Sequence, residues 1–324
     1  MPTLAGGEVL DECLRGLELQ TLDDFEVVVI DNSGTGRARA HGSRVRVLSN
    51  QRNVGFGAAV NQAFHESTAP YIATLNDDAV ADPRWLETLL ADAESHPRTG
   101  MFASEVHLAG TGRLDSAGML IASDGSSKQR GHDGSPSLFV DAKEALLPSG
   151  SAALYRRTML DEIGLFDESF FLYCEDTDLG LRARWAGWDC RYVPGAVVEH
   201  RYSHSAGRAS PLKAYFVERN RIYTIVKSFP AGMLCTAPFA SVARYLWHVS
   251  AVFSGQGRTG EFRQSGSAAV LPFLVIRAYF AALLQLPKLL MERRRIRANR
   301  RVTATEFKSL LQRHAITVRQ VASL

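Results

Sequence analysis

The sequence predicts an α/β fold: a mostly parallel sheet covered by helices on both faces, followed by a helical C-terminal region. Two observations indicate the sheet. Over the first hundred residues, short apolar stretches of strand length alternate with stretches of helical periodicity, and the connections between them are short. A third observation marks the C-terminal region, where long apolar stretches and a run of arginines replace this alternation. We therefore expect two parts, residues 1–229 and 230–324.

The individual elements follow from local patterns. Apolar residues at helical spacing alternate with β-branched runs that open into polar turns. Residues 100–148 are richer in Gly, Ser and Asp, so we expect irregular strands and loops there, with a turn at residues 115–118. The elements expected in order are a helix at 8–19, a strand at 26–34, a strand at 45–49, a helix at 57–66, a strand at 70–75, a helix at 83–96, a helix at 176–185 and a strand at 190–199.

The composition excludes several classes of protein. With 324 residues, of which 46% are hydrophobic, the chain can bury a substantial core and is not a disordered protein. A net charge of +3 is too small to indicate nucleic-acid binding. The four cysteines include no C-x-x-C pair, so neither a zinc site nor a disulfide framework is indicated. The first residues lack the basic start and apolar stretch of a signal peptide, and we expect a cytoplasmic protein.

The most informative stretch is an acidic cluster that follows an aromatic run. Glu175, Asp176 and Asp178 come directly after residues 170–173, Phe-Phe-Leu-Tyr. Charged side chains are seldom buried unless they are paired or bound to a cation, so this cluster indicates a site. The alternative is that these acids lie in the first turn of a helix, where they complement the helix dipole and cap free amides.

A second acidic cluster favours the site over the helix start. Asn76, Asp77 and Asp78 follow the apolar stretch that we expect to form the third strand. In open α/β sheets, ligands bind at the carboxyl ends of the strands, where Asp31 and the loop 53–57 also fall. These loops are therefore expected to meet at one ligand.

A divalent metal ion is one candidate for that ligand. Mg²⁺ and Mn²⁺ prefer oxygen ligands and commonly bridge protein carboxylates to substrate phosphates, which makes Asp78 the best candidate ligand. The alternative is an ordinary Asn-Asp turn. His200 closes the expected strand at 190–199 and is a second candidate ligand, or else caps a turn. A pair with His204 would require a helix, which the preceding Pro-Gly and β-branched residues do not favour.

The loop at residues 50–61 offers small residues that lead into a helix. Backbone amides at such a helix start can approach a phosphate or a ribose, although the glycines also permit a simple tight turn. Gly55-Phe56-Gly57 lacks the third glycine of the dinucleotide-binding fingerprint, and no Gly-Lys-Ser/Thr occurs. Dehydrogenases and P-loop NTPases are therefore disfavoured.

The C-terminal region is typical of membrane association. The apolar stretches 231–253 and 268–290 contain Arg244 and Arg277, and a central arginine in a membrane span costs about 2.5–3.5 kcal/mol. An interfacial or re-entrant helix fits these stretches better than a span. Six arginines at residues 293–301 would attract anionic lipid, at about 1 kcal/mol for each basic residue. The alternative is a solvated basic helix end on a soluble bundle.

Six motifs follow one another along residues 7–221: Val27–Ser33, the loop Asn53-Val54-Gly55-Phe56-Gly57 with Asn61, Leu75–Asp78, Gly150–Arg157, Gly164–Glu168, and Glu175–Leu179 with Arg182 and Gly187. In their residues and order they resemble the bacterial inverting glycosyltransferases of family 2, which have the GT-A fold, and in particular their rhamnosyltransferase-like and galactofuranosyltransferase-like branch. Asn76 stands at the first acidic position of that family's D-x-D motif, and the first strand, at residues 1–5, is shorter than the family's.

The resemblance implies a role for each matched residue. Asp31 would contact the nucleobase, Asp78 and His200 would hold Mg²⁺ or Mn²⁺ on the diphosphate, and Asp176 would be the general base. Glu175 would position the acceptor or Asp176, while Asp178 would serve the helix start. The remaining residues expected at the nucleotide are Asn53, Gly55, Asn61, Asn76 and Asp77.

We therefore expect a catalytic domain at residues 1–229 and a membrane-associated basic region at 230–324. The expected reaction transfers L-rhamnose from dTDP-rhamnose to a cell-envelope or polyprenyl-linked glycan, at the cytoplasmic face of the membrane. One alternative is a UDP-sugar donor such as UDP-galactofuranose, N-acetylglucosamine or glucose. The other is a catalytically silent scaffold that binds sugar nucleotides.

Overall fold

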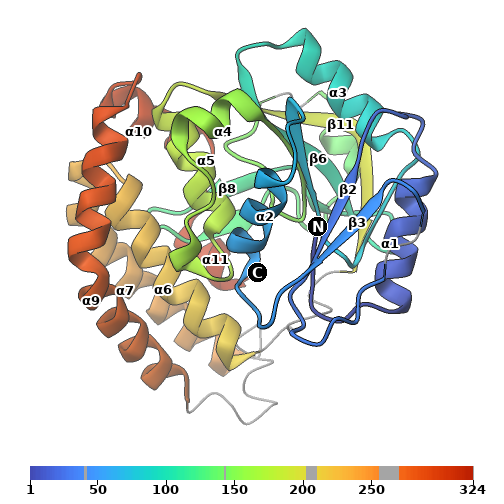
Figure 1. Cartoon of the computed structure of the whole chain (residues 1–324). Helices are drawn as coiled ribbons and strands as arrows, with labels where there is room; N and C mark the ends of the chain where they lie inside the picture. The colour runs from blue at the N-terminus through green and yellow to red at the C-terminus, as the bar shows by residue number, and fades with distance from the viewer. Residues whose placement is uncertain (40–41, 142–143, 202–209, 255–269, 324) are drawn as a thin grey trace. The chain divides into compact units, whose positions relative to one another are not determined.

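The computed structural model describes residues 1–39, 42–141, 144–201, 210–254 and 270–323, with the backbone alone described at 251–254 (Figure 1). The chain forms two compact units. Unit 1 comprises Met1–Met119, Gln129–Phe171 and Trp188–His204, and unit 2 comprises Leu120–Lys128, Leu172–Gly187 and Ser205–Leu324. We expect a boundary between residues 229 and 230 that separates a catalytic part from a membrane-associated part. This boundary stays a prediction.

The first sheet of unit 1 is parallel, with the strand order β1-β2-β3. Its strands are β1 (Pro2–Thr3), β2 (Val27–Asp31) and β3 (Val45–Ser49). Successive side chains of a strand point to opposite faces. Accordingly, Val27 and Val29 of β2 join the core cluster that contains α1 (Glu8–Glu18), whereas Val28 and Ile30 pack with Ala59 of α2 (Phe56–His65). Helices thus cover both faces of this sheet, as the sequence predicts.

The second sheet of unit 1 is mixed and has the order β4-β10-β6-β11-β5, with β7 paired to β6. Only β6 and β11 run parallel, and every other pair is antiparallel. Its strands are β4 (Tyr71–Leu75), β5 (Ala79–Ala81), β6 (Thr99–Leu108), β7 (Arg113–Ser116), β10 (Ala152–Arg156) and β11 (Asp189–His200).

The structure departs only in part from the two expectations for residues 100–148, which are irregular strands and loops with a turn at residues 115–118. Strand β6 is a ten-residue strand at the centre of the second sheet, and most of its residues are buried. Its pairings with β7 and β11 contain register shifts. Its polar Ser104 is accommodated because its hydroxyl accepts a hydrogen bond from the indole of Trp85, at 2.8 Å. The turn expected at residues 115–118 is confined to the bend at Ala117 and Gly118, because Asp115 and Ser116 belong to β7.

Helices α1 and α3 (Trp85–Ser95) contribute to the main core of unit 1, together with side chains of both sheets. Trp85 and Phe102 are among its largest fully buried side chains. A short helix α4 (Arg157–Ile163) follows β10 directly, and the 3-10 turns η1 (Pro136–Leu138) and η2 (Glu168–Phe170) complete the unit. The α/β class expected from the alternation of strands and helices is confirmed.

Unit 2 is mainly helical. Helix α9 (Leu271–Ala298) packs along α6 (Pro211–Ser228), and α11 (Val318–Ser323) packs on α7 (Ala231–Ser254) (Figure 1). The unit also contains α5 (Glu175–Trp185) and α10 (Ala304–Arg313). The short strands β8 (Met119–Ile121) and β9 (Ser127–Gln129) pair as a hairpin.

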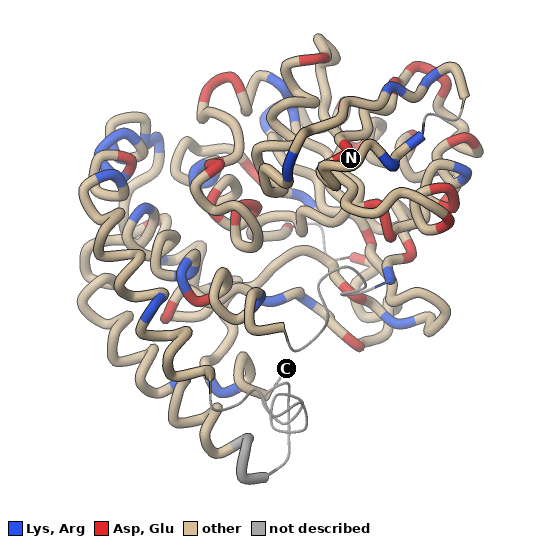
Figure 2. Tube along the Cα trace, turned by 60° about the horizontal axis from the view of Figure 1, so that its bottom comes forward, with Lys and Arg blue, Asp and Glu red and all other residues tan. Residues whose placement is uncertain are grey.

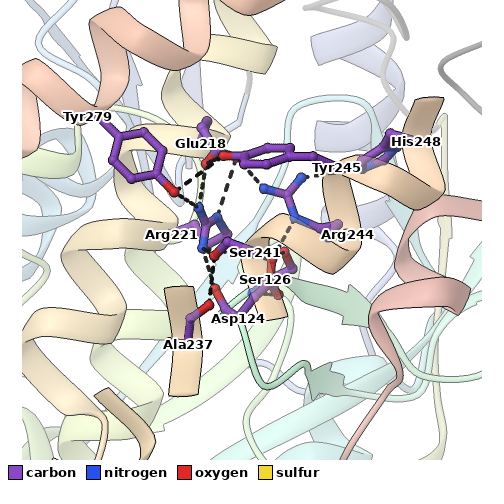
Figure 3. A network of polar contacts seen from close by, with 10 residues as sticks. All are labelled: Asp124, Ser126, Glu218, Arg221, Ala237, Ser241, Arg244, Tyr245, His248 and Tyr279. Atoms are coloured by element: carbon purple, nitrogen blue, oxygen red, sulfur yellow. Dashed lines mark hydrogen bonds and ion pairs between the residues drawn. The ribbon is translucent and has the colours of Figure 1, made fainter. Parts of the chain in front are cut away.

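Buried ion pairs connect the helices of unit 2 (Figure 3). Arg244 of α7 donates to Asp124, at 2.6 Å, and to Glu218 of α6, also at 2.6 Å. Arg221 of α6 pairs with Glu218 as well, and its Nη1 donates to Ser241 of α7 at 3.0 Å. Each charge faces an opposite charge, which offsets the cost of removing these groups from water.

Candidate active site

Asp78 and His200 lie together in unit 1. Asp78 occupies the turn between β4 and β5, and His200 is the last residue of β11, which pairs with β5. Their side chains are buried, and Asp78 Oδ1 lies 3.2 Å from His200 Nε2. His204, considered as a second histidine ligand, lies outside the described residues.

A third carboxylate, Asp115 of β7, holds the other side of the imidazole. His200 Nδ1 lies 2.8 Å from Asp115 Oδ2, and His132 Nδ1 lies 3.1 Å from Asp115 Oδ1. Burial opposes the charged form of His200, but the hydrogen bonds to Asp115 and Asp78 prevail and raise the pKa of His200 to about 9. Burial likewise opposes ionisation of Asp115, but His132 and His200 hold its pKa below the usual value.

The Asp78 and His200 side chains fit two neighbouring positions around a divalent cation. In an octahedral site with metal–ligand distances of about 2.1 Å, adjacent ligands are about 3 Å apart. The observed separation of 3.2 Å between Oδ1 and Nε2 is close to this value. Within the described residues, no group of three or more His, Cys, Asp or Glu side chains is arranged as a metal site.

The two residues before Asp78 have different surroundings. Asn76 Nδ2 lies 3.3 Å from His200 Nε2, so the amide faces the same imidazole edge as Asp78. Asp77 instead accepts a hydrogen bond from Thr3 Oγ1 at 2.6 Å, and burial raises its pKa. Asp77 therefore connects the turn to the short strand β1.

Asp31 ends β2 and organises the loop that follows. Its Oδ1 accepts a hydrogen bond from Ser33 N at 2.8 Å, and its Oδ2 accepts one from Ala38 N at 2.9 Å. Burial opposes ionisation, but these hydrogen bonds prevail and lower the pKa of Asp31. A carboxylate has about four acceptor positions, so two backbone bonds leave capacity for a ligand N–H.

The loop at Asn53 to Gly57 is shaped by a close backbone contact. Asn53 Oδ1 accepts a hydrogen bond from Gly55 N at 2.8 Å, and Gly55 has a φ of 91°. A Cβ atom at residue 55 would lie 2.3 Å from the carbonyl oxygen of Phe171, and the same oxygen accepts a hydrogen bond from Phe56 N. Glycine is therefore required at residue 55 by both conformation and space.

Asn61 performs a structural task that its place in the motif does not reveal. Its Nδ2 donates to Phe166 O at 2.9 Å, and its Oδ1 accepts from Phe166 N at 3.1 Å. Glu168 Oε1 accepts from the same amide group at 3.2 Å. Asn61 thus fastens α2 to the segment 166–168, and its amide is engaged there.

The second acidic cluster lies in unit 2, at the start of α5. The backbone before it is strained, because Tyr173 and Cys174 have φ values of 68° and 64° without being glycine. Asp176 Oδ1 accepts a hydrogen bond from Thr177 N at 2.6 Å. Glu175 is buried, and burial together with the charge of Asp176 raises its pKa to about 8. At neutral pH, Glu175 is therefore mostly a neutral acid.

Helix α6 holds this acidic turn on both sides. Asn220 Nδ2 donates to the carbonyl oxygens of Leu172 and Tyr173, at 2.8 and 2.7 Å. Lys227 Nζ lies 2.8 Å from Asp178 Oδ1. Asn220 and Lys227 are seven residues apart and share one face of the helix, so the strained turn is fixed to α6 before and after the acids.

The structure therefore brings Asn76, Asp78 and His200 together in unit 1, and Glu175 and Asp176 together in unit 2. The meeting of these two groups at one ligand stays a prediction. Asp115, Asn220 and Lys227 are absent from the residues expected from the sequence. For Asn220 and Lys227, the signal in the sequence is a pair of polar side chains, seven residues apart, at positions of α6 that face the core.

Comparison with known proteins places these motifs in a family. Residues 1–164 match the family model described as Glycosyl transferase family 2. The N-acetylglucosaminyl-diphospho-decaprenol L-rhamnosyltransferase of Mycobacterium tuberculosis (strain CDC 1551 / Oshkosh) is 31% identical over 242 residues. This match covers 66% of the present chain and 79% of the relative. The rhamnosyltransferase WbbL of Escherichia coli (strain K12) is 39% identical over 67 residues, 21% of this chain and 25% of that one.

A solved structure supports the expected fold. The mannosyltransferase PcManGT from Pyrobaculum calidifontis, in complex with GDP-Man and Mn²⁺, superposes with a TM-score of 0.52. The superposition covers 92% of this chain and 85% of that one, at 14% identity. This likeness shows the fold alone, and the GT-A expectation is confirmed.

Proposed function

This chain belongs to glycosyl transferase family 2, and from that premise we propose that it transfers L-rhamnose from dTDP-rhamnose to a hydroxyl of a polyprenyl-linked or cell-envelope glycan. The chain is a glycosyltransferase, and inversion at the sugar is characteristic of the family. The observation that carries the proposal is the 31% identity to a rhamnosyltransferase, over 79% of its length, whose name specifies a polyprenyl diphosphate acceptor.

The proposed donor site is the carboxyl end of the strands of unit 1. Asp31 would accept a hydrogen bond from the nucleobase, and the loop of Asn53 and Gly55 would bring backbone amides to the ribose or phosphates. Asp78 and His200, with Asn76 beside them, would hold Mg²⁺ or Mn²⁺. The cation, when bound, would neutralise the developing charge of the departing diphosphate.

The proposed chemistry depends on Asp176. Its carboxylate would take the proton of the acceptor hydroxyl as that oxygen attacks C1 of the sugar opposite the diphosphate, which inverts the anomeric centre. Glu175, which is mostly neutral at neutral pH, would place no second negative charge beside Asp176. It would donate a hydrogen bond to the acceptor or to Asp176. Asn220 and Lys227 would keep both acids in place.

Membrane association through unit 2 is the second part of the proposal. Helix α9 is long and apolar enough to cross a membrane by length and composition. One face of α9 is buried and apolar, with Leu274, Ala278, Ala282 and Leu289. The opposite, outward face of the helix is also apolar. Its exposed large side chains recur at helical spacing: Phe273, Ile276, Phe280, Leu283 and Leu284. Exposed apolar surface of this extent is typical of a membrane or protein contact.

The charges of unit 2 favour an anionic membrane as the partner. Before Lys288, the only charged residue of α9 is Arg277. Figure 2 shows basic residues gathered at one end of the C-terminal helices. Arg294, Arg295 and Arg300 are exposed there. Arg293 and Arg297 have a different task, because both donate to the carbonyl oxygen of Phe229, at 2.7 and 3.0 Å. An α9 helix lying in the interface would bury its apolar stripe and set the exposed arginines among the headgroups.

A donor panel tests the proposed reaction. Purified protein is incubated with dTDP-rhamnose, UDP-galactofuranose, UDP-N-acetylglucosamine or UDP-glucose, with Mn²⁺ or Mg²⁺ and a polyprenyl diphosphate-linked N-acetylglucosamine acceptor. The proposal expects transfer from dTDP-rhamnose. Transfer only from a UDP-sugar would support the alternative donor, and nucleotide binding without any turnover would support the scaffold.

A further inference from the structure

Asp115 occupies an unusual place in the second sheet of unit 1. The pairing of β6 with β7 joins Val106 to Ser116 and His107 to Leu114, so Asp115 is the extra residue of a β-bulge between them. Bulges re-aim a side chain and are over-represented beside active sites. At this bulge the Asp115 carboxylate is 2% exposed, and its two oxygens face two different histidines.

The hydrogen bonds fix which nitrogen of His200 faces Asp78. An ionised carboxylate can only accept hydrogen bonds, so Asp115 Oδ2 requires an N–H at His200 Nδ1, 2.8 Å away. The opposite nitrogen, Nε2, then points to Asp78 Oδ1 at 3.2 Å and to the amide of Asn76 at 3.3 Å. His132 holds the second oxygen of Asp115 at 3.1 Å and limits its rotation.

We propose that Asp115 is a positioning residue of the metal site, which aims His200 Nε2 at the cation and is itself held by His132. This inference rests on the proposed function, because it requires Asp78 and His200 to be the ligands. Carboxylates that orient a ligating histidine fix its tautomer and its basicity, and losing one typically weakens metal binding 10- to 100-fold.

Metal binding can be measured without turnover. Mn²⁺ alone is titrated into purified full-length protein, and the free ion is followed by electron paramagnetic resonance. Asp115→Asn keeps the shape of the side chain but replaces an obligate acceptor with an amide, and we expect its Mn²⁺ affinity to fall about 10- to 100-fold. Pulsed spectra should show ¹⁴N coupling from a coordinated imidazole in the wild type, and a weaker signal in the variant.

A double-mutant cycle separates positioning from general loss of stability. Because Asp115 acts through His200, Asp115→Asn should have no further effect on Mn²⁺ affinity in a His200→Ala background. Glu105→Gln is the matched control: Glu105 Oε1 lies 2.9 Å from His107 Nε2 on the same sheet, and removing its charge should leave Mn²⁺ affinity unchanged. The Mn²⁺ affinity of each variant is measured under conditions in which that variant is folded, below its own unfolding midpoint. Asp115→Glu, which keeps the charge, should recover part of the affinity.

The outcomes distinguish this inference from the function on which it rests. Equal Mn²⁺ affinity of the wild type and Asp115→Asn, or a full additional loss in the His200→Ala background, would overturn the role of Asp115 and leave the proposed transferase standing. A wild type that binds no Mn²⁺ would overturn the metal site and this inference together, while sugar transfer could still be observed.

Discussion

Lys227 Nζ lies 2.8 Å from Asp178 Oδ1, and both side chains are almost completely buried. Arg182 Nε donates to the other oxygen of Asp178 at 2.9 Å. From the sequence, Asp178 was expected only to serve the start of its helix. Its contacts show a wider role, because the same carboxylate joins the first turn of α5 to α6.

Replacing Lys227 should therefore destabilise unit 2. Lys227→Met leaves Asp178 buried with one cation instead of two, and removing one partner of a buried pair costs about 3–5 kcal/mol. We expect the free energy of unfolding, measured in urea, to fall by about 3 kcal/mol. The exposed pair of Arg44 and Asp23 is the control, since Arg44→Met should cost less than about 1 kcal/mol. If Lys227→Met also costs less than about 1 kcal/mol, the buried pair of Lys227 and Asp178 contributes little to stability.

Asn220 should matter more for turnover than for substrate binding. Asn220→Asp has the same shape but loses both hydrogen bonds to the carbonyl oxygens of Leu172 and Tyr173. Relaxation of the strained turn would displace the acids, and displacement by about 1 Å can cost about 100-fold in rate. We expect kcat to fall by about this factor while the KM for the donor changes little. The exposed Asn299→Asp is the control, and an equal loss there would refute the assignment.

Glu175 should make stability depend on pH. Its pKa of about 8 in the folded protein exceeds the ordinary value of 4.5, so the folded state holds a proton that the unfolded chain releases. The stabilisation from this proton is complete below about pH 4.5 and is lost as pH rises through about 8, at no more than about 1.4 kcal/mol per pH unit. Glu175→Gln should remove this dependence, as measured by urea unfolding across the range. The exposed Glu94→Gln should keep the wild-type profile, and an unchanged profile in Glu175→Gln would contradict the account.

The exposed arginines of the C-terminal region should control binding to anionic lipid. Arg294, Arg295 and Arg300 together would contribute about 3 kcal/mol, so replacing all three with serine should weaken binding to phosphatidylglycerol-containing vesicles about 100-fold. Co-sedimentation with vesicles measures this. Arg44, Arg84 and Arg113, which are exposed in unit 1, provide a triple serine control with the same change in charge. If both triple variants bind equally well, the basic end of α9 is not a lipid contact.

Much of unit 1 could be predicted from local patterns. The strand at 45–49 has the expected bounds, and most neighbouring helices and strands differ by one or two residues at their ends. The strand expected at 26–34 ends three residues earlier, at Asp31. Strand β6 was missed because Ser104 and Glu105 interrupt its apolar pattern. Their partners, the Trp85 indole and Gly195 N, come from distant segments, and no local pattern reveals them.

The candidate site, too, could be predicted from the sequence only in part. Acids at the ends of strands could be identified because their positions follow from the order of the elements. Asp115 could not, since its role depends on a bulge in the pairing of β6 with β7 and on two histidines distant in sequence. Asn61 lies in a recognised motif, yet its contacts with Phe166 are structural, and only the tertiary arrangement distinguishes the two possibilities.

The central claim is that Asp176 accepts the proton of the acceptor. The most direct test is the rate of rhamnose transfer from dTDP-rhamnose by Asp176→Asn, measured beside the affinity of the same variant for the donor nucleotide. We expect a loss of about 10²- to 10⁴-fold in rate, with donor affinity retained, because only the base is removed. Transfer within a few-fold of the wild-type rate would contradict it.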